Sequence, residues 1–271
     1  MTFHKILAGC QEGDRAAWKA FLADYTPIAL RLFSLYLPLN PVGQTDFWRE
    51  ALVALCADNY QALQGFEDQA EREFLVDLRA FLLDRALPNL DPSQDSTAVT
   101  RPTVGTVTAL LKGLPLLHQE IIFLTLAGYS LARLEKMLRI TPTVAQEGLK
   151  RLEADFAAAL NRSEDKCLWP AAWLEVTRSA RASPTESCAP LRQLVRILDG
   201  QASWYDKSPV EEHRSTCLHC LENWTALLEV VGWEREAKPL SLDEIKPLLA
   251  CLPIQPIEKS GKSLLARILG K

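Results

Sequence analysis

Apolar residues recur along this chain with the spacing of one face of an α-helix. No stretch alternates apolar and polar residues for long enough to predict a β-strand. Pro38 and Pro41 interrupt the pattern and separate two of the expected helices. The sequence therefore predicts an all-α protein. Its clearest helical segments are 6–10, 16–25, 28–37, 46–63, 71–87, 104–161 and 191–198.

Two polar stretches divide this helical pattern. Residues 88–102 hold three prolines and have no periodicity, which predicts a linker. A second boundary is expected at 178–187, which is rich in serine and short polar residues. The expected organisation is a helical domain at 1–88, a linker at 89–103, a helical domain at 104–162, a connector at 163–184, a small module at 185–232 and a tail with an amphipathic segment at 233–271.

Composition narrows the class of protein. A chain of 271 residues with 48% hydrophobic residues can form two or three compact units. The net charge of −4 argues against bulk electrostatic binding of nucleic acid, so any DNA contact is expected to be local. Seven cysteines, no apolar signal segment and no apolar run of about 20 residues predict a cytoplasmic protein without a transmembrane segment.

Four of the ligands that zinc prefers stand close together in the last third of the chain. His213 precedes Cys217 by one helical turn, Cys220 follows in a Cys-x-x-Cys pair, and Cys188 lies 25 residues before His213. The spacing predicts a tetrahedral Cys3His zinc site. The alternative is that these are unrelated thiols and an incidental histidine that share no metal ion. His219 is the competing imidazole. Because four protein ligands close the coordination sphere, the site is expected to be structural. The protein is therefore not expected to be an enzyme.

A helix-turn-helix is predicted in the second domain. One helix ends at Gly128, Ser130 begins the next, and Thr141 followed by a proline begins a third that is expected to reach Leu160. The alternative to a DNA-binding helix-turn-helix is a helical hairpin that only packs within the domain. The alternative to a DNA-contacting surface on the third helix is a surface that contacts only solvent. The side chains expected to contact base edges or phosphates of DNA are Arg139, Thr143, Gln146, Glu147, Lys150 and Arg151.

These segments resemble parts of two known families. Leu114–Arg151 is similar to region 4 of extracytoplasmic-function sigma factors, and Gly13–Tyr25 resembles the start of region 2. The stretch Asp46, Trp48, Arg49 and Glu50 is similar to the family's helix that binds core RNA polymerase. Cys188 to Cys220 looks like the zinc-binding anti-sigma domain, with all four ligand positions matched. The resemblance implies a transcription initiation factor that binds core RNA polymerase and promoter DNA and is regulated in cis by a structural zinc module, in which the thiols of some family members respond to oxidants.

Departures from the sigma pattern leave a second hypothesis open. Residues 1–90 carry eight basic against twelve acidic side chains, whereas 102–162 carry seven against five. In residues 74–86 of the helix that would melt DNA, only Arg79 and Arg85 are basic, against Asp77 and Asp84. Gly148 interrupts the recognition helix, where glycine costs about 1 kcal/mol relative to alanine. The alternative is therefore a sigma-like interaction protein, sensing redox state or zinc, that does not open promoters.

Overall fold

The computed structural model describes residues 1–66, 69–95, 100–160 and 162–254, and all regular structure in these ranges is helical. Thirteen α-helices and four short 3-10 helices are formed there, without a strand, which confirms the all-α prediction. No helix in the same ranges has the length and apolar character needed to span a membrane. The amphipathic segment expected at 260–271 lies outside the described residues.

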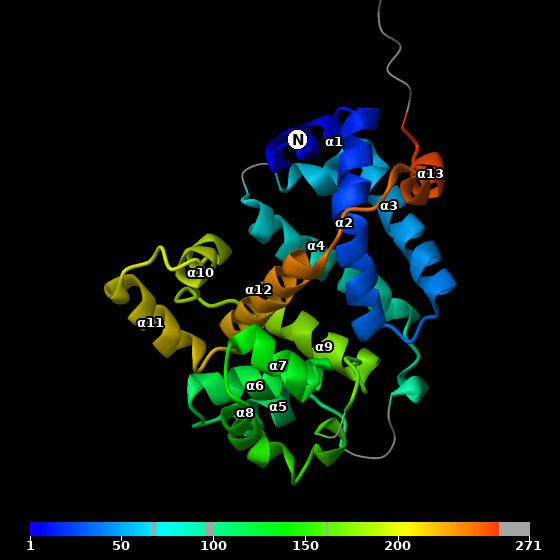
Figure 1. Cartoon of the computed structure of the whole chain (residues 1–271). Helices are drawn as coiled ribbons and strands as arrows, with labels where there is room; N and C mark the ends of the chain where they lie inside the picture. The colour runs from blue at the N-terminus through cyan, green and yellow to red at the C-terminus, as the bar shows by residue number, and fades with distance from the viewer. Residues whose placement is uncertain (67–68, 96–99, 161, 255–271) are drawn as a thin grey trace, which may run out of the picture. The chain divides into compact units, whose positions relative to one another are not determined.

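The helices group into two compact units (Figure 1). The first unit contains 1–27, 49–68 and the chain from 238 onward, and the second contains 28–48 and 69–237. The α-helices are α1 (Phe3–Gln11), α2 (Arg15–Tyr36), α3 (Pro41–Gln64), α4 (Glu71–Ala86), α5 (Val104–Leu111), α6 (Leu116–Ala127), α7 (Leu131–Leu138), α8 (Pro142–Leu149), α9 (Pro170–Arg181), α10 (Leu191–Leu198), α11 (Trp204–Arg214), α12 (Leu218–Glu236) and α13 (Leu242–Cys251).

Aromatic packing forms the centre of the first unit. Trp18 is fully buried, its ring lies 5.2 Å from that of Phe21, and its indole N–H donates to the Cys10 carbonyl at 3.0 Å. Tyr60 packs against Trp18 from α3, with ring centroids 6.2 Å apart. Tyr60 ends a short non-helical break within α3, and its φ of 62° is in the left-handed region. The break therefore directs this half-buried ring toward Trp18.

Helix α2 continues through Pro27, although the sequence pattern predicts two separate helical segments, 16–25 and 28–37. Proline has no N–H to donate to the carbonyl four residues earlier, which leaves the Ala23 oxygen without its helical partner. The Leu240 N–H donates to that oxygen at 2.9 Å. The chain leading into α13 thus satisfies the hydrogen bond that the proline removes.

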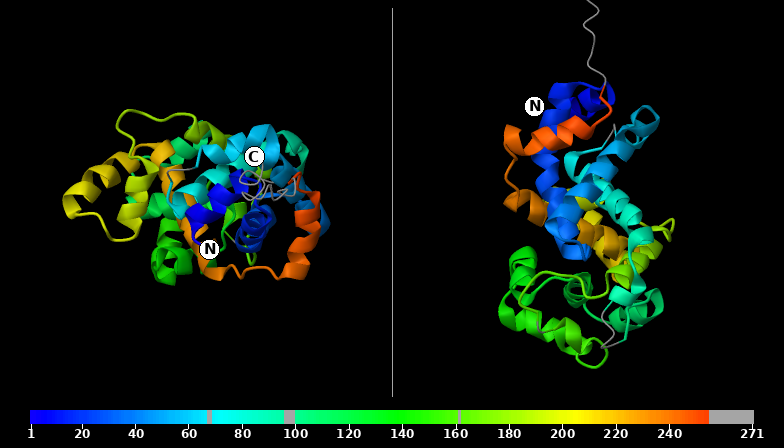
Figure 2. Two further views of the ribbon diagram at one scale, coloured as in Figure 1. Left: turned by 90° about the horizontal axis from the view of Figure 1, so that it is seen from above. Right: turned by 90° about the vertical axis from the view of Figure 1, so that its right-hand side faces the viewer.

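Helix α12 runs through the middle of the second unit. It packs against α4, α9, α6, α7, α10 and α11 (Figure 1), and eleven of its nineteen residues are buried. Helix α9 lies in the stretch expected to be a connector, 163–184, but buried Trp173 and Leu174 make it part of the core. Helices α10 and α11 project at one edge of this unit (Figure 2). The segment 188–220, which carries the four predicted metal ligands, therefore shares one core with α4 and α6.

The expected linker also has a structural role in the second unit. The side chain of Asp95 is buried, and its two carboxylate oxygens accept the backbone N–H groups of Ala171 and Ala172 at 3.0 and 3.2 Å. Those donors lie in the first turn of α9, where helical N–H groups have no partner within the helix. Asp95 thus caps a helix 76 residues further along the chain.

The three helices of the predicted helix-turn-helix are present, with two differences. Thr141 is the N-cap of α8 and a proline opens its first turn, as predicted. Ser130 stands at the start of α7, but its hydroxyl donates to Asp165 at 2.8 Å and makes no cap to its own helix. The prediction that the third helix reaches Leu160 is wrong, because α8 ends at Leu149 and tightens into a 3-10 turn. This bend brings Phe156 against Trp169, with ring centroids 5.7 Å apart.

Gly148 is explained by the close approach of α8 to α6. A Cβ at this position would lie 2.8 Å from Cδ1 and 3.2 Å from Cγ2 of Ile121, which is fully buried.

We expect Gly148→Ala to destabilise the protein by about 1–3 kcal/mol through overpacking, as measured by urea unfolding. Gly105→Ala is the matched control, because a Cβ on this exposed helical glycine meets only open space and the Thr103 hydroxyl at 3.9 Å. That change is expected to stabilise the protein by about 0.5–1 kcal/mol, and the same sign for both variants would contradict the packing argument.

Candidate metal centre

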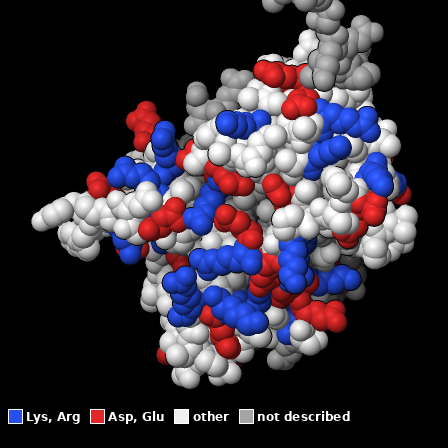
Figure 3. Space-filling view, turned by 45° about the horizontal axis from the view of Figure 1, so that its top comes forward, with Lys and Arg blue, Asp and Glu red and all other residues white. Residues whose placement is uncertain are grey.

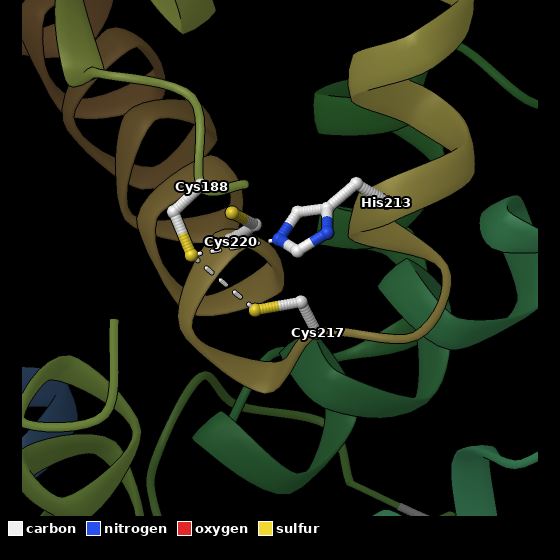
Figure 4. A group of neighbouring side chains, drawn as sticks. All are labelled: Cys188, His213, Cys217 and Cys220. Atoms are coloured by element: carbon white, nitrogen blue, oxygen red, sulfur yellow. Dashed lines mark hydrogen bonds between the residues drawn. The ribbon is translucent and has the colours of Figure 1, made fainter. Parts of the chain in front are cut away.

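Three separate elements supply the four predicted ligands. Cys188 lies in the loop before α10, and His213 lies in the last turn of α11. Cys217 is the N-cap residue of α12, with extended backbone, and Cys220 lies in the first turn of the same helix. The short turn between α11 and α12 reverses the chain, so that the four side chains point toward one another (Figure 4).

The spacing of the ligand atoms fits a tetrahedral metal site. One ligand atom from each of Cys188, His213, Cys217 and Cys220 can be chosen so that all lie within 4.8 Å of one another. The Cys188 Sγ is 3.5 Å from the His213 Nε2 and 3.7 Å from the Cys217 Sγ. Zinc bonds of about 2.3 Å to sulfur and about 2.0 Å to nitrogen give tetrahedral edges of about 3.8 and 3.5 Å. The sulfur separation is far too long for a disulfide, and all of these cysteines are free thiols.

Cys188 is held in a turn that stabilises its thiolate. The Thr185 N–H donates to its Sγ at 3.2 Å, and the Thr185 hydroxyl lies 3.4 Å from the same atom. Burial opposes ionisation of this thiol, but the hydrogen bonds from Thr185 and His213 lower its pKa to about 6. Thiolate is the form that binds metals, so Cys188 is prepared as a ligand.

Cys220 has the opposite electrostatic environment. Its side chain is fully buried, and burial together with the neighbouring thiols Cys188 and Cys217 raises its pKa to about 12. A second thiolate in this cluster is therefore unfavourable without a positive charge. A divalent cation at the centre removes that repulsion and lowers the pKa of every coordinating thiol.

His219 lies outside the cluster. Its Nδ1 is 3.2 Å from the Ala180 carbonyl oxygen and 3.1 Å from that of Arg181, and its Nε2 is 3.0 Å from the Asn223 side-chain nitrogen. The other imidazole, His213, directs its Nε2 at Cys188. The structure thus brings together the four residues predicted as ligands and gives His219 a different set of partners.

The turn between the ligands is attached to α6, the first helix of the helix-turn-helix. The Gln119 amide donates to the Ser215 carbonyl at 2.9 Å. The buried Arg214 guanidinium forms an ion pair with Glu120 at 3.0 Å and lies 3.9 Å from the centre of the Trp224 ring. The position of the metal-binding turn is therefore coupled directly to α6.

The side chains expected to contact DNA are all on the surface. They lie on α8, on the turn before it and on the 3-10 turn after it, and none is buried. On the face drawn in Figure 3, Lys and Arg are interspersed with Asp and Glu. The six exposed residues are Arg139, Thr143, Gln146, Glu147, Lys150 and Arg151.

The four residues expected to bind polymerase lie on α3 but differ in accessibility. Asp46 and Glu50 are exposed, and Arg49 is half-buried. Trp48 is fully buried, with its ring 6.3 Å from that of Phe33. Trp48 is therefore a core residue in this structure. It has no exposed surface with which to contact RNA polymerase, contrary to the prediction.

Sequence reasoning missed a buried ionic network beside the metal-binding turn. The Arg79 side chain, 2% exposed, forms ion pairs with Glu222 at 2.8 Å and with Glu229 at 2.6 Å. Tyr36 donates to Glu229, and Arg181 pairs with Glu222 at 3.1 Å. Both acids come from α12 and lie seven residues apart on a mainly apolar helix. Two carboxylates on a mainly apolar helix indicate in the sequence that they have a buried basic partner. They do not show that this partner is Arg79.

No protein-family model, curated protein or solved structure matches this chain.

Proposed function

We propose that Cys188, His213, Cys217 and Cys220 hold one structural zinc ion. The convergence of one imidazole nitrogen and three sulfurs, at separations that fit tetrahedral zinc, supports this assignment. Zinc would neutralise the thiolates and fix the turn between α11 and α12. Four protein ligands leave no open position for a reacting water, so the site has no catalytic role.

We also propose that the chain is a sigma-like transcription regulator that binds DNA through α8. The exposed polar face of α8 carries this proposal. Gln146 and Glu147 offer groups that can read base edges in the major groove, and Lys150 and Arg151 can neutralise phosphates. Helices α6 and α7 pack against α8 and hold it in place, as the supporting helices of a helix-turn-helix do.

The buried network favours a regulator that does not open promoters. Arg79 is one of three basic residues on α4, the helix that by resemblance would melt DNA, and its charge is neutralised by carboxylates of α12. Nine of the sixteen residues of α4 are buried. Uncovering α4 would also expose the apolar residues of α12, including Leu221 and Leu227. We therefore favour the second hypothesis, a sigma-like interaction or sensing protein that does not open promoters, and we add that the segment 185–232 covers α4 permanently.

Binding to DNA is expected to depend on the basic residues that follow α8. The double variant Lys150→Ala with Arg151→Ala is expected to reduce the slope of log affinity against log salt concentration by about two. The measurement is titration of labelled random-sequence duplex DNA at several salt concentrations. Lys207→Ala, on the exposed surface of α11, is the control and should leave the slope unchanged. A wild-type slope in the double variant would exclude α8 as the DNA-binding helix.

Run-off transcription with core RNA polymerase separates the two hypotheses. A sigma-like protein that cannot open promoters is expected to bind polymerase or DNA but to give no transcript from linear templates. Pull-down with the double variant Asp46→Ala and Glu50→Ala, both exposed on α3, tests the polymerase contact. Promoter-dependent transcripts would support the initiation factor and contradict a permanently covered α4.

A further inference from the structure

A cavity of about 280 Å³ lies in the second unit among α7, α10 and α12. Seven of its thirteen lining residues have apolar side chains, among them Leu138, Leu198 and Leu228, and five of the others are charged. The volume equals roughly nine water molecules at about 30 Å³ each, at the lower end of the range for small-ligand pockets. Size alone therefore selects a compact ligand of about ten heavy atoms.

The acidic residues at the cavity already have basic partners. Asp199 lines the cavity and forms an ion pair with Arg72, which also pairs with Glu234 at 3.2 Å. Glu120, a second lining residue, pairs with buried Arg214 at 3.0 Å. Each of the two lining carboxylates therefore has an arginine partner, Arg72 or Arg214.

Two further arginines at the cavity have no such partner. Arg139 and Arg235 both line it, both are exposed, and neither forms an ion pair within the part of the chain that the structure describes. Arg139 occupies the turn between α7 and α8 with a left-handed φ of 55°, and Arg235 lies in the last turn of α12. Guanidinium groups form paired hydrogen bonds with carboxylates, so this rim has the chemistry of an anion site.

We propose that the cavity binds a small monocarboxylate with an aliphatic tail. The tail occupies the space among the leucines, where burial of apolar surface provides the affinity. The carboxylate lies at the rim between Arg139 and Arg235. A single negative charge suits two guanidiniums beside neutralised acids, and octanoate, with ten heavy atoms, matches the volume.

Isothermal titration calorimetry with octanoate and octanamide tests the proposal. Octanoate is expected to bind about tenfold more tightly than octanamide, because only the carboxylate pairs with the guanidiniums. Leu228→Trp fills the cavity and should abolish binding, while Arg139→Asn and Arg235→Gln should each weaken it at least fivefold. Asn tolerates the left-handed backbone at position 139. Circular dichroism and thermal midpoints check that each variant is folded.

Lys136→Gln is the matched control, since Lys136 is exposed on α7 and does not line the cavity. It should bind octanoate as the wild type does. Equal affinity for octanoate and octanamide, unchanged binding in Leu228→Trp, or equal losses in Lys136→Gln and Arg139→Asn would each overturn the proposal.

One consequence rests on the proposed function, because Arg139 is also among the residues proposed to contact DNA. Octanoate is expected to weaken DNA binding by the wild type and to have no effect on Leu228→Trp. Octanoate binding without any DNA binding would contradict the proposed function and leave the pocket in place. DNA binding that octanoate does not change would contradict the proposed competition at Arg139.

Discussion

Chelation of the metal is expected to unfold the edge of the second unit formed by α10, α11 and the start of α12. Structural zinc contributes folding free energy on the order of 10 kcal/mol in small modules, which exceeds what the few buried residues of α11 contribute. Only Val210 and Arg214 are buried on α11. Hydrogen exchange followed by mass spectrometry should show loss of protection over 185–220, at least about a hundredfold in rate.

The first unit provides the internal control for chelation. Its core around Trp18 shares no ligand with the cluster, so α1 should keep its protection when metal is removed. Cys251→Ser, at a half-buried thiol outside the cluster, is expected to respond to chelator as the wild type does. Uniform loss of protection over the whole chain, or none over 185–220, would contradict a local structural role for the metal.

Removal of Arg79 is expected to destabilise the protein by about 3–5 kcal/mol. Arg79→Met leaves the carboxylates of Glu222 and Glu229 buried without their main counterion, and an uncompensated buried charge is costly. Burial already raises the pKa of Glu229, and Arg79 opposes that rise. In the variant this pKa rises further, so protonation favours the folded state. The loss of stability, measured by urea unfolding, should therefore shrink as the pH falls.

Two variants show whether the charge of Arg79 or its packing matters. Arg79→Met combined with Glu222→Gln and Glu229→Gln removes the charges together and should recover most of the stability, since neutral replacements for buried ion pairs are well tolerated. Arg85→Met, at an exposed position on the same helix, should change stability by less than about 0.5 kcal/mol. A cost for Arg79→Met as small as that for Arg85→Met would contradict the buried network.

The metal ligands could be found from sequence because local spacing carries the information. His213, Cys217 and Cys220 lie within eight residues and across one chain reversal, so few backbone arrangements separate them. The all-α class and the start of α8 at Thr141 were likewise predictable from periodicity and capping. These features depend on neighbours in sequence, where helical geometry fixes the distances.

Features that depend on distant partners were not predictable in the same way. Glu222 reads as an ordinary helical carboxylate, and its partner Arg79 lies 143 residues earlier. Gly148 reads as a weak point in a helix until Ile121 of α6 is placed against it. Trp48 lies in a stretch that resembles a polymerase-binding helix, but the hydrophobic effect buries it beside Phe33. In each case the tertiary contact overrides the local preference.

The most direct test of the metal centre is elemental analysis of the purified full-length chain and of two single variants. The wild type and His219→Ala are expected to contain about one zinc ion per chain, because His219 bonds to backbone carbonyls away from the cluster. Cys217→Ser is expected to contain much less, since it removes one of the four ligands. A full equivalent of zinc in Cys217→Ser, or its loss in His219→Ala, would contradict the assignment.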